Sequence, residues 1–424
     1  MIRTPSFQPS PSMRALGRNL ALDLVAATGV GVTMALITAL LPTIARRGGL
    51  EPIGLSFLAA APFVANLLSA FAGRFGPRSS AQMSLLRGAG AASLLLLFVL
   101  PTAPVMIAVA FVFWISMSFG GPFHLRLWGA MYPARLVGRM VGFIGMGRAA
   151  AGALAAFVGG IVADRLGGPS AVAVAGVVGV VCALAYAGLR SRSAERPPSF
   201  SARGSIQALR ERPLLGKVAL AQGFYGGGLI AAVPLYALVH VDRLDLKLTD
   251  VGVIGILAAV STTVSFPIWG AVADRHGGLW SLRLGSTLGV IGLIGYALAP
   301  HVAVLWVMAV GYGAASAAID VGIASVVSDQ TPLASRAAAM AGWNAITGAR
   351  GIAAAFLMSA LLQLGIVDVT SGLLVCAVSS AIGVAMFARV NPNPSDPVAE
   401  AIPAHGPGPV QVRVASRSRT APSG

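Results

Sequence analysis

Ionisable residues lie inside long apolar stretches of this 424-residue chain, where a charge is costly, and four of them are candidates for a function. Arg148 and Arg350 each lie roughly ten residues into such a stretch, or about 15 Å along a helix that rises 1.5 Å per residue. Asp23 and Asp320 lie in two other stretches. If these stretches cross a bilayer, a charge at the centre of one costs on the order of 2.5 to 3.5 kcal/mol, so each needs a partner or a function.

The chemistry open to these groups is anion binding and proton transfer. The planar guanidinium of arginine donates paired hydrogen bonds to a carboxylate, phosphate or sulfate, so Arg148 and Arg350 at similar depths could form an anion clamp. The alternative is that each arginine forms a structural ion pair with Asp23 or Asp320. Desolvation favours the neutral form of a carboxyl group, so Asp23 and Asp320 are also candidates for carrying a coupling proton.

Arg148 borders a row of small residues. Gly138, Gly145, Gly152 and Gly159 recur every seven residues, which predicts a helix face that lets another helix approach closely. Arg148 should therefore face protein and not lipid.

Further candidates for substrate binding are uncharged side chains in the same kind of stretch, each of which could equally be a polar group that packs between helices. These are Gln222, Tyr225, Asn66, Trp343 and Asn344. No catalytic residues are expected, because the five histidines are scattered and form no paired His and Glu, no Ser-His set and no metal-ligand spacing. We expect no cofactor and no metal. No Gly-x-x-x-x-Gly-Lys motif occurs in the sequence, so ATP-driven pumping is not expected.

Twelve apolar stretches position these residues. Hydrophobic residues make up 56% of the chain, charged residues 10%, and the mean hydropathy is +0.81, values typical of an integral membrane protein. The predicted all-α spans are 19–43, 53–72, 83–100, 104–128, 137–162, 169–189, 214–239, 250–273, 280–299, 303–327, 336–363 and 367–388.

An even number of spans places both termini on one side of the membrane. Most Lys and Arg residues outside the spans lie in the tails and loops of that side, and five lie opposite: Arg46, Arg47, Arg165, Arg243 and Lys247. Positive charge marks the cytoplasmic side, so we expect cytoplasmic termini in a plasma-membrane protein. The net charge of +16 is spread over loops instead of one folded face, so the expected partner is the lipid bilayer and not nucleic acid. We expect a monomer.

A basic segment divides the spans into six and six. We predict a cytoplasmic tail at 1–18, a six-helix bundle at 19–189, a cytoplasmic linker at 190–213, a second bundle at 214–388 and a disordered tail at 389–424. The two halves repeat, since Ser69-Ala-Phe-Ala-Gly73-Arg74-Phe-Gly76-Pro-Arg78 aligns with Gly270-Ala-Val-Ala-Asp274-Arg275-His-Gly277-Gly278. Such repeats mark secondary transporters whose substrate binds between the halves near the midplane.

These motifs also carry a family resemblance. The Gly270-x-x-x-Asp274-Arg275-x-Gly277-Gly278 segment and Tyr132-Pro133-x-x-x-x-Gly138-Arg139-x-x-Gly142 resemble two loop signatures of the major facilitator superfamily, and the resemblance extends over about residues 15 to 390. It implies two pseudo-symmetric six-helix bundles that rock about a central cavity. Helices 1, 4, 7 and 10 would line this cavity, and helices 3, 6, 9 and 12 would face lipid.

The resemblance further implies a conformational latch formed by Gly270, Asp274, Arg275 and Gly277, with Arg74 and Arg78 in the first-half copy. Gly73 stands where the family usually has an Asp, so Asp274 should carry more of the conformational bias. A similar Asp164-Arg165 pair lies on the opposite side of the membrane and is interpreted as a helix end and turn.

The expected function is secondary active transport of a small solute by alternating access, with proton coupling and an anionic or amphiphilic substrate as specific hypotheses. An efflux antiporter for drugs or metabolites is an alternative. Two features that the family resemblance leads one to expect in such proteins are missing: span 5 lacks the Gly-Pro pair typical of drug and proton antiporters, and span 4 lacks the mid-helix Arg of many proton-coupled members. A receptor or scaffold that does not transport is an alternative of another class. Polar groups that face a shared cavity favour transport.

The orientation can be tested by cysteine labelling. Cys182 and Cys376 lie in apolar stretches and can be replaced by Ala. We then expect Ser201→Cys, in the linker, to stay unmodified when an impermeant maleimide is added to intact cells and to react after permeabilisation. Labelling in intact cells would show that the orientation is wrong.

Overall fold

The computed structural model describes residues 13–69, 75–190, 212–331 and 333–390, except for the side chains of 13, 134–135 and 333–338. Gly73, Arg74, nearly all of the linker and the C-terminal tail lie outside these residues.

The described residues form the predicted twelve spans. Eleven helical segments are long and apolar enough to cross a membrane, and Pro52–Leu68 is a shorter apolar helix. In chain order the helices are α1 (Met13–Ala35), α2 (Leu41–Arg47), α3 (Pro52–Leu68), α5 (Ser80–Ala92), α6 (Ala103–Met131), α7 (Ala134–Leu166), α8 (Gly168–Ala187), α10 (Pro213–Ala231), α11 (Val233–Leu238), α12 (Leu248–His276), α13 (Gly278–Leu298), α14 (Val302–Gln330), α15 (Leu333–Gln363) and α16 (Val369–Arg389). The first span combines α1 and α2, and the seventh combines α10 and α11.

The first span of each half contains a π-helical segment in its second part. Leu36–Leu40 joins α1 to α2, and Val239–Arg243 follows α11 at the end of the seventh span. A π-helical segment interrupts the regular ladder of hydrogen bonds and often marks a functional site. The third span instead ends in a 3-10 helix at Ser93–Phe98.

Local sequence explains several helix ends. Proline occupies the first turn of α3 and α10, where its missing N–H removes no helical hydrogen bond. Asp368 caps α16 by accepting a hydrogen bond from the Ser371 amide, which lowers the pKa of Asp368. Gly167 (φ +92°) ends α7 and Gly277 (φ +87°) ends α12, and both adopt a backbone conformation that side chains with a Cβ rarely reach.

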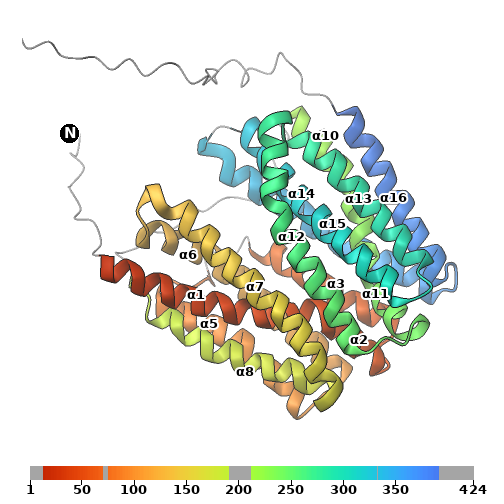
Figure 1. Cartoon of the computed structure of the whole chain (residues 1–424), viewed down its shortest axis with the longest axis horizontal. Helices are drawn as coiled ribbons and strands as arrows, with labels where there is room; N and C mark the ends of the chain where they lie inside the picture. The colour runs from red at the N-terminus through yellow and green to blue at the C-terminus, as the bar shows by residue number, and fades with distance from the viewer. Residues whose placement is uncertain (1–12, 70–74, 191–211, 332, 391–424) are drawn as a thin grey trace, which may run out of the picture. The chain divides into compact units, whose positions relative to one another are not determined.

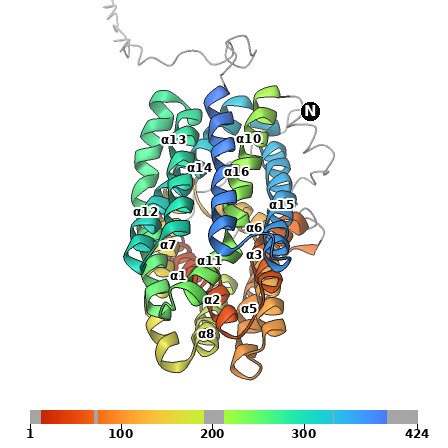
Figure 2. The ribbon, with the colours of Figure 1, turned by 90° about the vertical axis from the view of Figure 1, so that its right-hand side faces the viewer.

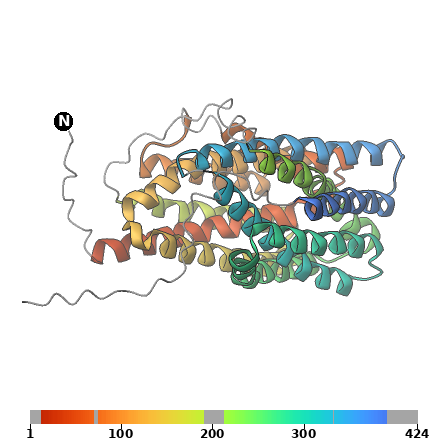
Figure 3. The same cartoon turned by 90° about the horizontal axis from the view of Figure 1, so that it is seen from above.

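The helices gather in two groups, α1 to α8 and α10 to α16 (Figure 1). Within them the long helices run roughly parallel, as Figures 2 and 3 show from two further directions. Contacts between the groups are made mainly by α7 with α12 and by α3 with α15. In Figure 1, α7 and α12 lie together near α2 and diverge toward their other ends, so the groups meet at the ends of these helices near α2.

Glycine permits the close contact between α7 and α12. A Cβ added at Gly160 would lie 2.5 Å from the Leu248 carbonyl oxygen, and one at Gly252 would lie 2.5 Å from the Ala156 carbonyl oxygen. In the predicted glycine row, Gly152 and Gly159 contact the first span, whereas Gly138 and Gly145 have no other atom within 4 Å of such a Cβ. Only the second half of the row serves helix packing in this conformation.

We expect Gly160→Ala to weaken the α7 and α12 contact, because its Cβ would meet backbone that must shift. The cost should be roughly 1 to 3 kcal/mol, as for other overpacked sites. The matched control is Gly145→Ala in the same helix, where space is open and Ala favours the helix. Thermal unfolding of both purified variants measures the difference, and equal melting temperatures would contradict this account of the interface.

Candidate functional site

A central cavity of about 680 Å³ lies between the two helix groups. Ligand cavities commonly measure 300 to 1,000 Å³, so the space suits a small organic solute. Its lining comes from spans 1, 2, 4, 5, 7, 8, 9 and 10. The family resemblance implied spans 1, 4, 7 and 10; α13, expected to face lipid, contributes Gly289, Gly292, Leu293 and Tyr296.

Arg148 is the one Asp, Glu, Lys or Arg among the described residues that line this cavity. Its side chain is exposed, and none of the hydrogen bonds or ion pairs found among the described residues involves it. Neither Asp23 nor Asp320 therefore neutralises it in this conformation. A cation without a counter-ion in a cavity with mostly apolar walls attracts an anion.

Arg350 does not line the cavity with Arg148. Its guanidinium donates a hydrogen bond to the backbone carbonyl of Gln222 on α10, while its Nε has no partner. The group fits beside α10 because Gly226 has no side chain: a Cβ there would lie 2.9 Å from one guanidinium nitrogen. The two arginines are thus not brought to one site in this conformation.

Asp23 is fully buried and forms hydrogen bonds with residues on one face of α6 and with the residue that directly follows this helix. His124 Nε2 lies 2.8 Å from Oδ1, and Trp128 Nε1 donates to Oδ2 at 2.6 Å. Tyr132 donates its hydroxyl to Oδ2 at 3.4 Å, and burial, followed by the charge of Asp23, raises the pKa of this phenol. The carboxylate therefore has a protonatable imidazole beside it and two neutral donors that hold it in place.

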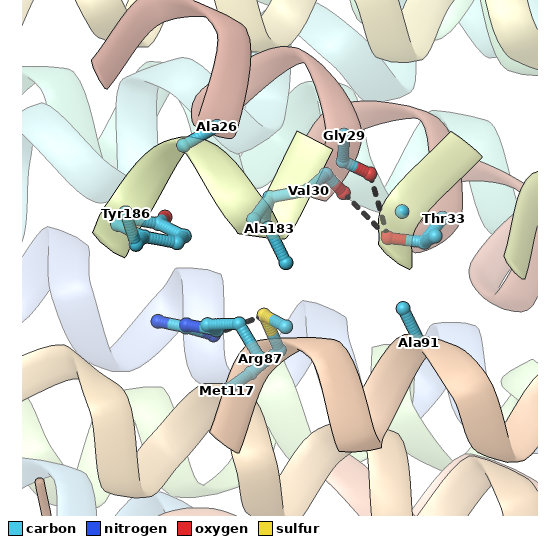
Figure 4. Close-up of a pocket in the computed structure, with 10 residues that line it drawn as sticks. Ala26, Gly29, Val30, Thr33, Arg87, Ala91, Met117, Ala183 and Tyr186 are labelled. Carbon is cyan, nitrogen blue, oxygen red and sulfur yellow. Dashed lines mark hydrogen bonds between the residues drawn. The ribbon is translucent and has the colours of Figure 1, made fainter. Parts of the chain in front are cut away.

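A buried arginine lies near this cluster. Arg87 on α5 is 7% exposed, and its guanidinium donates to the Met117 sulfur, while Nε has no partner. Figure 4 shows the guanidinium beside a small pocket that Tyr186 and Thr33 also line. Tyr186 packs edge-on against His124 with ring centroids 5.3 Å apart, so aromatic contact connects Arg87 to the Asp23 cluster.

The other predicted binding residues divide between packing and exposure. Gln222 and Tyr225 are buried, and Trp343 packs in the same apolar core as Tyr225. Asn66 accepts a hydrogen bond from Ser118 at 3.5 Å. Asn344 and Asp320 are exposed, and neither lines the central cavity.

Asp164 joins the two helix groups on the side where they meet. Its carboxylate accepts hydrogen bonds from the backbone N–H groups of Leu248 and Thr249, both at 2.9 Å, and from the Thr249 hydroxyl at 2.6 Å. The first amides of α12 have no helical partner and carry a positive partial charge, so the negative carboxylate is favoured there. Asp164 is therefore more than the helix end and turn that its sequence suggested.

Further contacts close the same side. Arg46 forms an ion pair with Asp242 at 2.9 Å, and Arg47 donates to the carbonyl of Leu246. Thr43 and His240 lie 3.2 Å apart through Oγ1 and Nδ1. Asp242 and His240 belong to the second π-helical segment, and the first continues directly into the helix that carries Thr43, so both segments shape this closure.

The predicted latch lies at the opposite ends of the helices. Asp274 and Arg275 are exposed, and none of the hydrogen bonds or ion pairs found among the described residues involves Asp274. Gly277 forms the end of α12, Gly270 has open space around it, and the Arg78 amide donates to the Gln82 side chain. A role for these residues in another conformation stays a prediction.

Some site residues could have been found from sequence. His124, Trp128 and Tyr132 recur every four residues, which places them on one helix face opposite a buried acid. Arg87 lies within the predicted third span, so the cost of a charge within a span is the sequence signal for it. The cavity tyrosines Tyr236, Tyr296 and Tyr312 carry no such signal, because they come from three helices that only the fold brings together.

Known proteins share this fold. The sequence profile of the Major Facilitator Superfamily matches residues 24–264 and 218–421. The structure is similar to the nucleoside transporter NupG (TM-score 0.70, 12% identity, 89% of this chain and 99% of that chain). It is also similar to a bacterial homologue of the human lysosomal transporter Spinster in an inward-facing, occupied conformation (TM-score 0.68, 15% identity, 90% of this chain and 98% of that chain). A third similar structure is the human organic anion transporter MFSD10 (TETRAN), with a TM-score of 0.58 and 14% identity over 91% of this chain and 100% of that chain. No curated protein sequence matches the chain.

A multi-pass membrane transporter is the class that this fold and central cavity define. The chain belongs to the major facilitator superfamily, because the family profile covers most of its length. Sequence identities of 15% or less to the solved structures show the shared fold alone.

We expect Asp164→Asn to loosen the closed side by roughly 1 to 2 kcal/mol, since it removes a charge from the α12 N-terminus. Spin labels at Thr102→Cys and His301→Cys, in a background without Cys182 and Cys376, report the separation of the groups by electron–electron resonance. The variant should populate longer distances.

Asp368→Asn is the matched control, because Asp368 also caps a helix but bonds only within α16. Its distance distribution should match that of the unmodified protein. An unchanged distribution in Asp164→Asn would show that this carboxylate does not hold the groups together.

Proposed function

We propose that this protein is a secondary active transporter that moves a small anionic solute through the central cavity by alternating access. The observation that carries the proposal is Arg148, an exposed arginine without a counter-ion in a cavity of about 680 Å³ between the helix groups. A structural arginine would be expected to have a partner, because an unpaired charge within a span is costly. An anionic solute would supply that partner.

Alternating access is supported by the way the groups contact each other. On the closed side they meet through the hydrogen bonds of Asp164, the ion pair of Arg46 and the close backbone approach at Gly160. Such contacts can separate as units without disrupting either group. With cytoplasmic termini in the plasma membrane, as the distribution of Lys and Arg favours, this conformation is closed toward the outside.

The buried Asp23 cluster supports proton coupling. A carboxylate and an imidazole 2.8 Å apart can exchange a proton, and Trp128 keeps the carboxylate in place. Protonation of Asp23 would weaken its attraction to a protonated His124 and change the packing of α1 on α6. Proton uptake would then favour one conformation over the other. Asp320 remains a second candidate for this role.

Substitution of Arg148 tests the anionic substrate. Purified protein is first screened by thermal shift against anionic, neutral and cationic metabolites, because a ligand that binds only the folded state raises the melting temperature. We expect anions to stabilise the unmodified protein. Arg148→Lys keeps the charge but loses the bidentate geometry, so the affinity should fall roughly tenfold, and Arg148→Met should abolish binding.

Arg350→Lys is the comparison, because Arg350 donates to a backbone carbonyl and does not line the cavity. Equal loss of anion binding in both Lys variants would favour the two-arginine clamp. Stabilisation by neutral or cationic solutes, unchanged in Arg148→Met, would refute an anionic substrate.

Asp23→Asn tests the coupling. In proteoliposomes we expect it to abolish uptake driven by a pH gradient while preserving exchange of labelled for unlabelled substrate, which needs no net proton movement. Gradient-driven uptake at the unmodified rate would exclude Asp23 as the coupling group.

A further inference from the structure

The cavity wall formed by the second helix group contains three tyrosines among mostly aliphatic and small residues. Tyr236 and Tyr296 lie with ring centroids 4.4 Å apart and an interplanar angle of 46°, and Tyr312 lines the same cavity. We call these three residues the tyrosine shelf. They come from α11, α13 and α14, so the fold alone assembles them. Aromatic rings bind other flat rings with more energy than their buried area alone provides.

His240 lies at one edge of the tyrosine shelf, with its ring centroid 6.0 Å from that of Tyr296. It is 6% exposed and lines the cavity. Its Nδ1 lies 3.2 Å from the Thr43 hydroxyl, whereas its buried Nε2 has no hydrogen-bond partner. A buried polar atom without a partner is costly, so a ligand that offers a hydrogen bond here is favoured.

The charges of the cavity limit the charge of its ligand. Arg148 supplies one positive charge from the first helix group, and no Asp or Glu lies among the described lining residues. One negative charge on the ligand would neutralise Arg148. A second would be buried without a counter-ion, and a neutral ligand would leave Arg148 unpaired.

We propose that the cavity binds a planar aromatic monoanion, with the anionic group on Arg148, the ring on the tyrosine shelf and a ring hydroxyl or ring nitrogen at His240 Nε2. This inference rests on the proposed anionic substrate and adds the chemistry of the rest of that molecule. An aliphatic monoanion would satisfy Arg148 but would leave His240 without a partner. A single ligand would thus contact both helix groups, as coupling of binding to rocking requires.

Three probes of similar size separate these contributions. They are 4-hydroxybenzoate, cyclohexanecarboxylate, which keeps the charge but has neither the aromatic ring nor the hydroxyl, and 4-hydroxybenzyl alcohol, which keeps the ring and the phenolic hydroxyl but has no charge. Binding to the full-length protein in lipid nanodiscs is measured by calorimetry, with 6-hydroxy-2-naphthoate as a larger aromatic monoanion. We expect each aromatic monoanion to bind roughly three- to tenfold more tightly than cyclohexanecarboxylate, and the alcohol to bind most weakly.

Variants assign these differences to residues. Tyr236→Leu should weaken the binding of 4-hydroxybenzoate roughly three- to tenfold and leave that of cyclohexanecarboxylate unchanged. His240→Phe should weaken the hydroxylated probe relative to benzoate, because it removes the hydrogen bond but keeps a ring. The control is Phe356→Leu, which removes an aromatic ring that packs on Phe57 outside the cavity and should change neither affinity.

The outcomes separate the inference from the proposed function. Equal affinities for 4-hydroxybenzoate and cyclohexanecarboxylate, both lost in Arg148→Met, would overturn the aromatic assignment and leave the anionic substrate standing. Equal weakening of both acids by Tyr236→Leu would also overturn it, as would failure of both aromatic monoanions to bind. Tight binding of 4-hydroxybenzyl alcohol that persists in Arg148→Met would overturn both proposals.

Discussion

Hydrocarbon offers a charged or polar group neither hydrogen bonds nor counter-ions, and this constraint governs the interior of the protein. Each ionisable residue within the spans must reach a partner, a cavity or the membrane surface. Asp23 reaches an imidazole and two donors on α6 and at its end, and Arg350 reaches a backbone carbonyl of α10. Arg148 reaches the central cavity instead, which makes it the residue whose position most directly indicates a ligand.

The contact between the helix groups combines close approach with specific polar bonds. Gly160 and Gly252 bring the backbones of α7 and α12 together, and Asp164 binds the exposed amides at the start of α12. Because this attraction depends on the direction of the α12 N-terminus, it is lost when the helices move apart by even a short distance. Contacts of this kind fit the opening of the closed side that the proposed alternating access requires.

The two groups supply different chemistry to one cavity. The first contributes the cation Arg148, and the second contributes Tyr236, Tyr296 and His240. The repeated sequence motifs therefore describe a duplicated scaffold, whereas the cavity between the repeats is asymmetric. An asymmetric ligand with a charged end and a flat body fits this division better than a symmetric one.

The sequence by itself determined the class of fold. The length of the apolar stretches identified the twelve spans, because a helix needs about 20 apolar residues to cross the lipid. The exact boundaries differ: α1 begins at Met13, six residues before the predicted start. Insertion cost also identified Arg148, Arg350, Asp23 and Asp320 as residues that need explanation.

Only the tertiary structure decided which partner each charge has. Depth along a helix follows from residue number, but direction and neighbours depend on how helices from distant parts of the chain pack. Asp23 and His124 are 101 residues apart, and Asp164 and Leu248 are 84 apart, so neither pairing could be read from spacing. The same reason explains why Gln222 and Tyr225 are buried outside the cavity lining, whereas the tyrosine shelf, assembled from three helices, is part of the cavity wall.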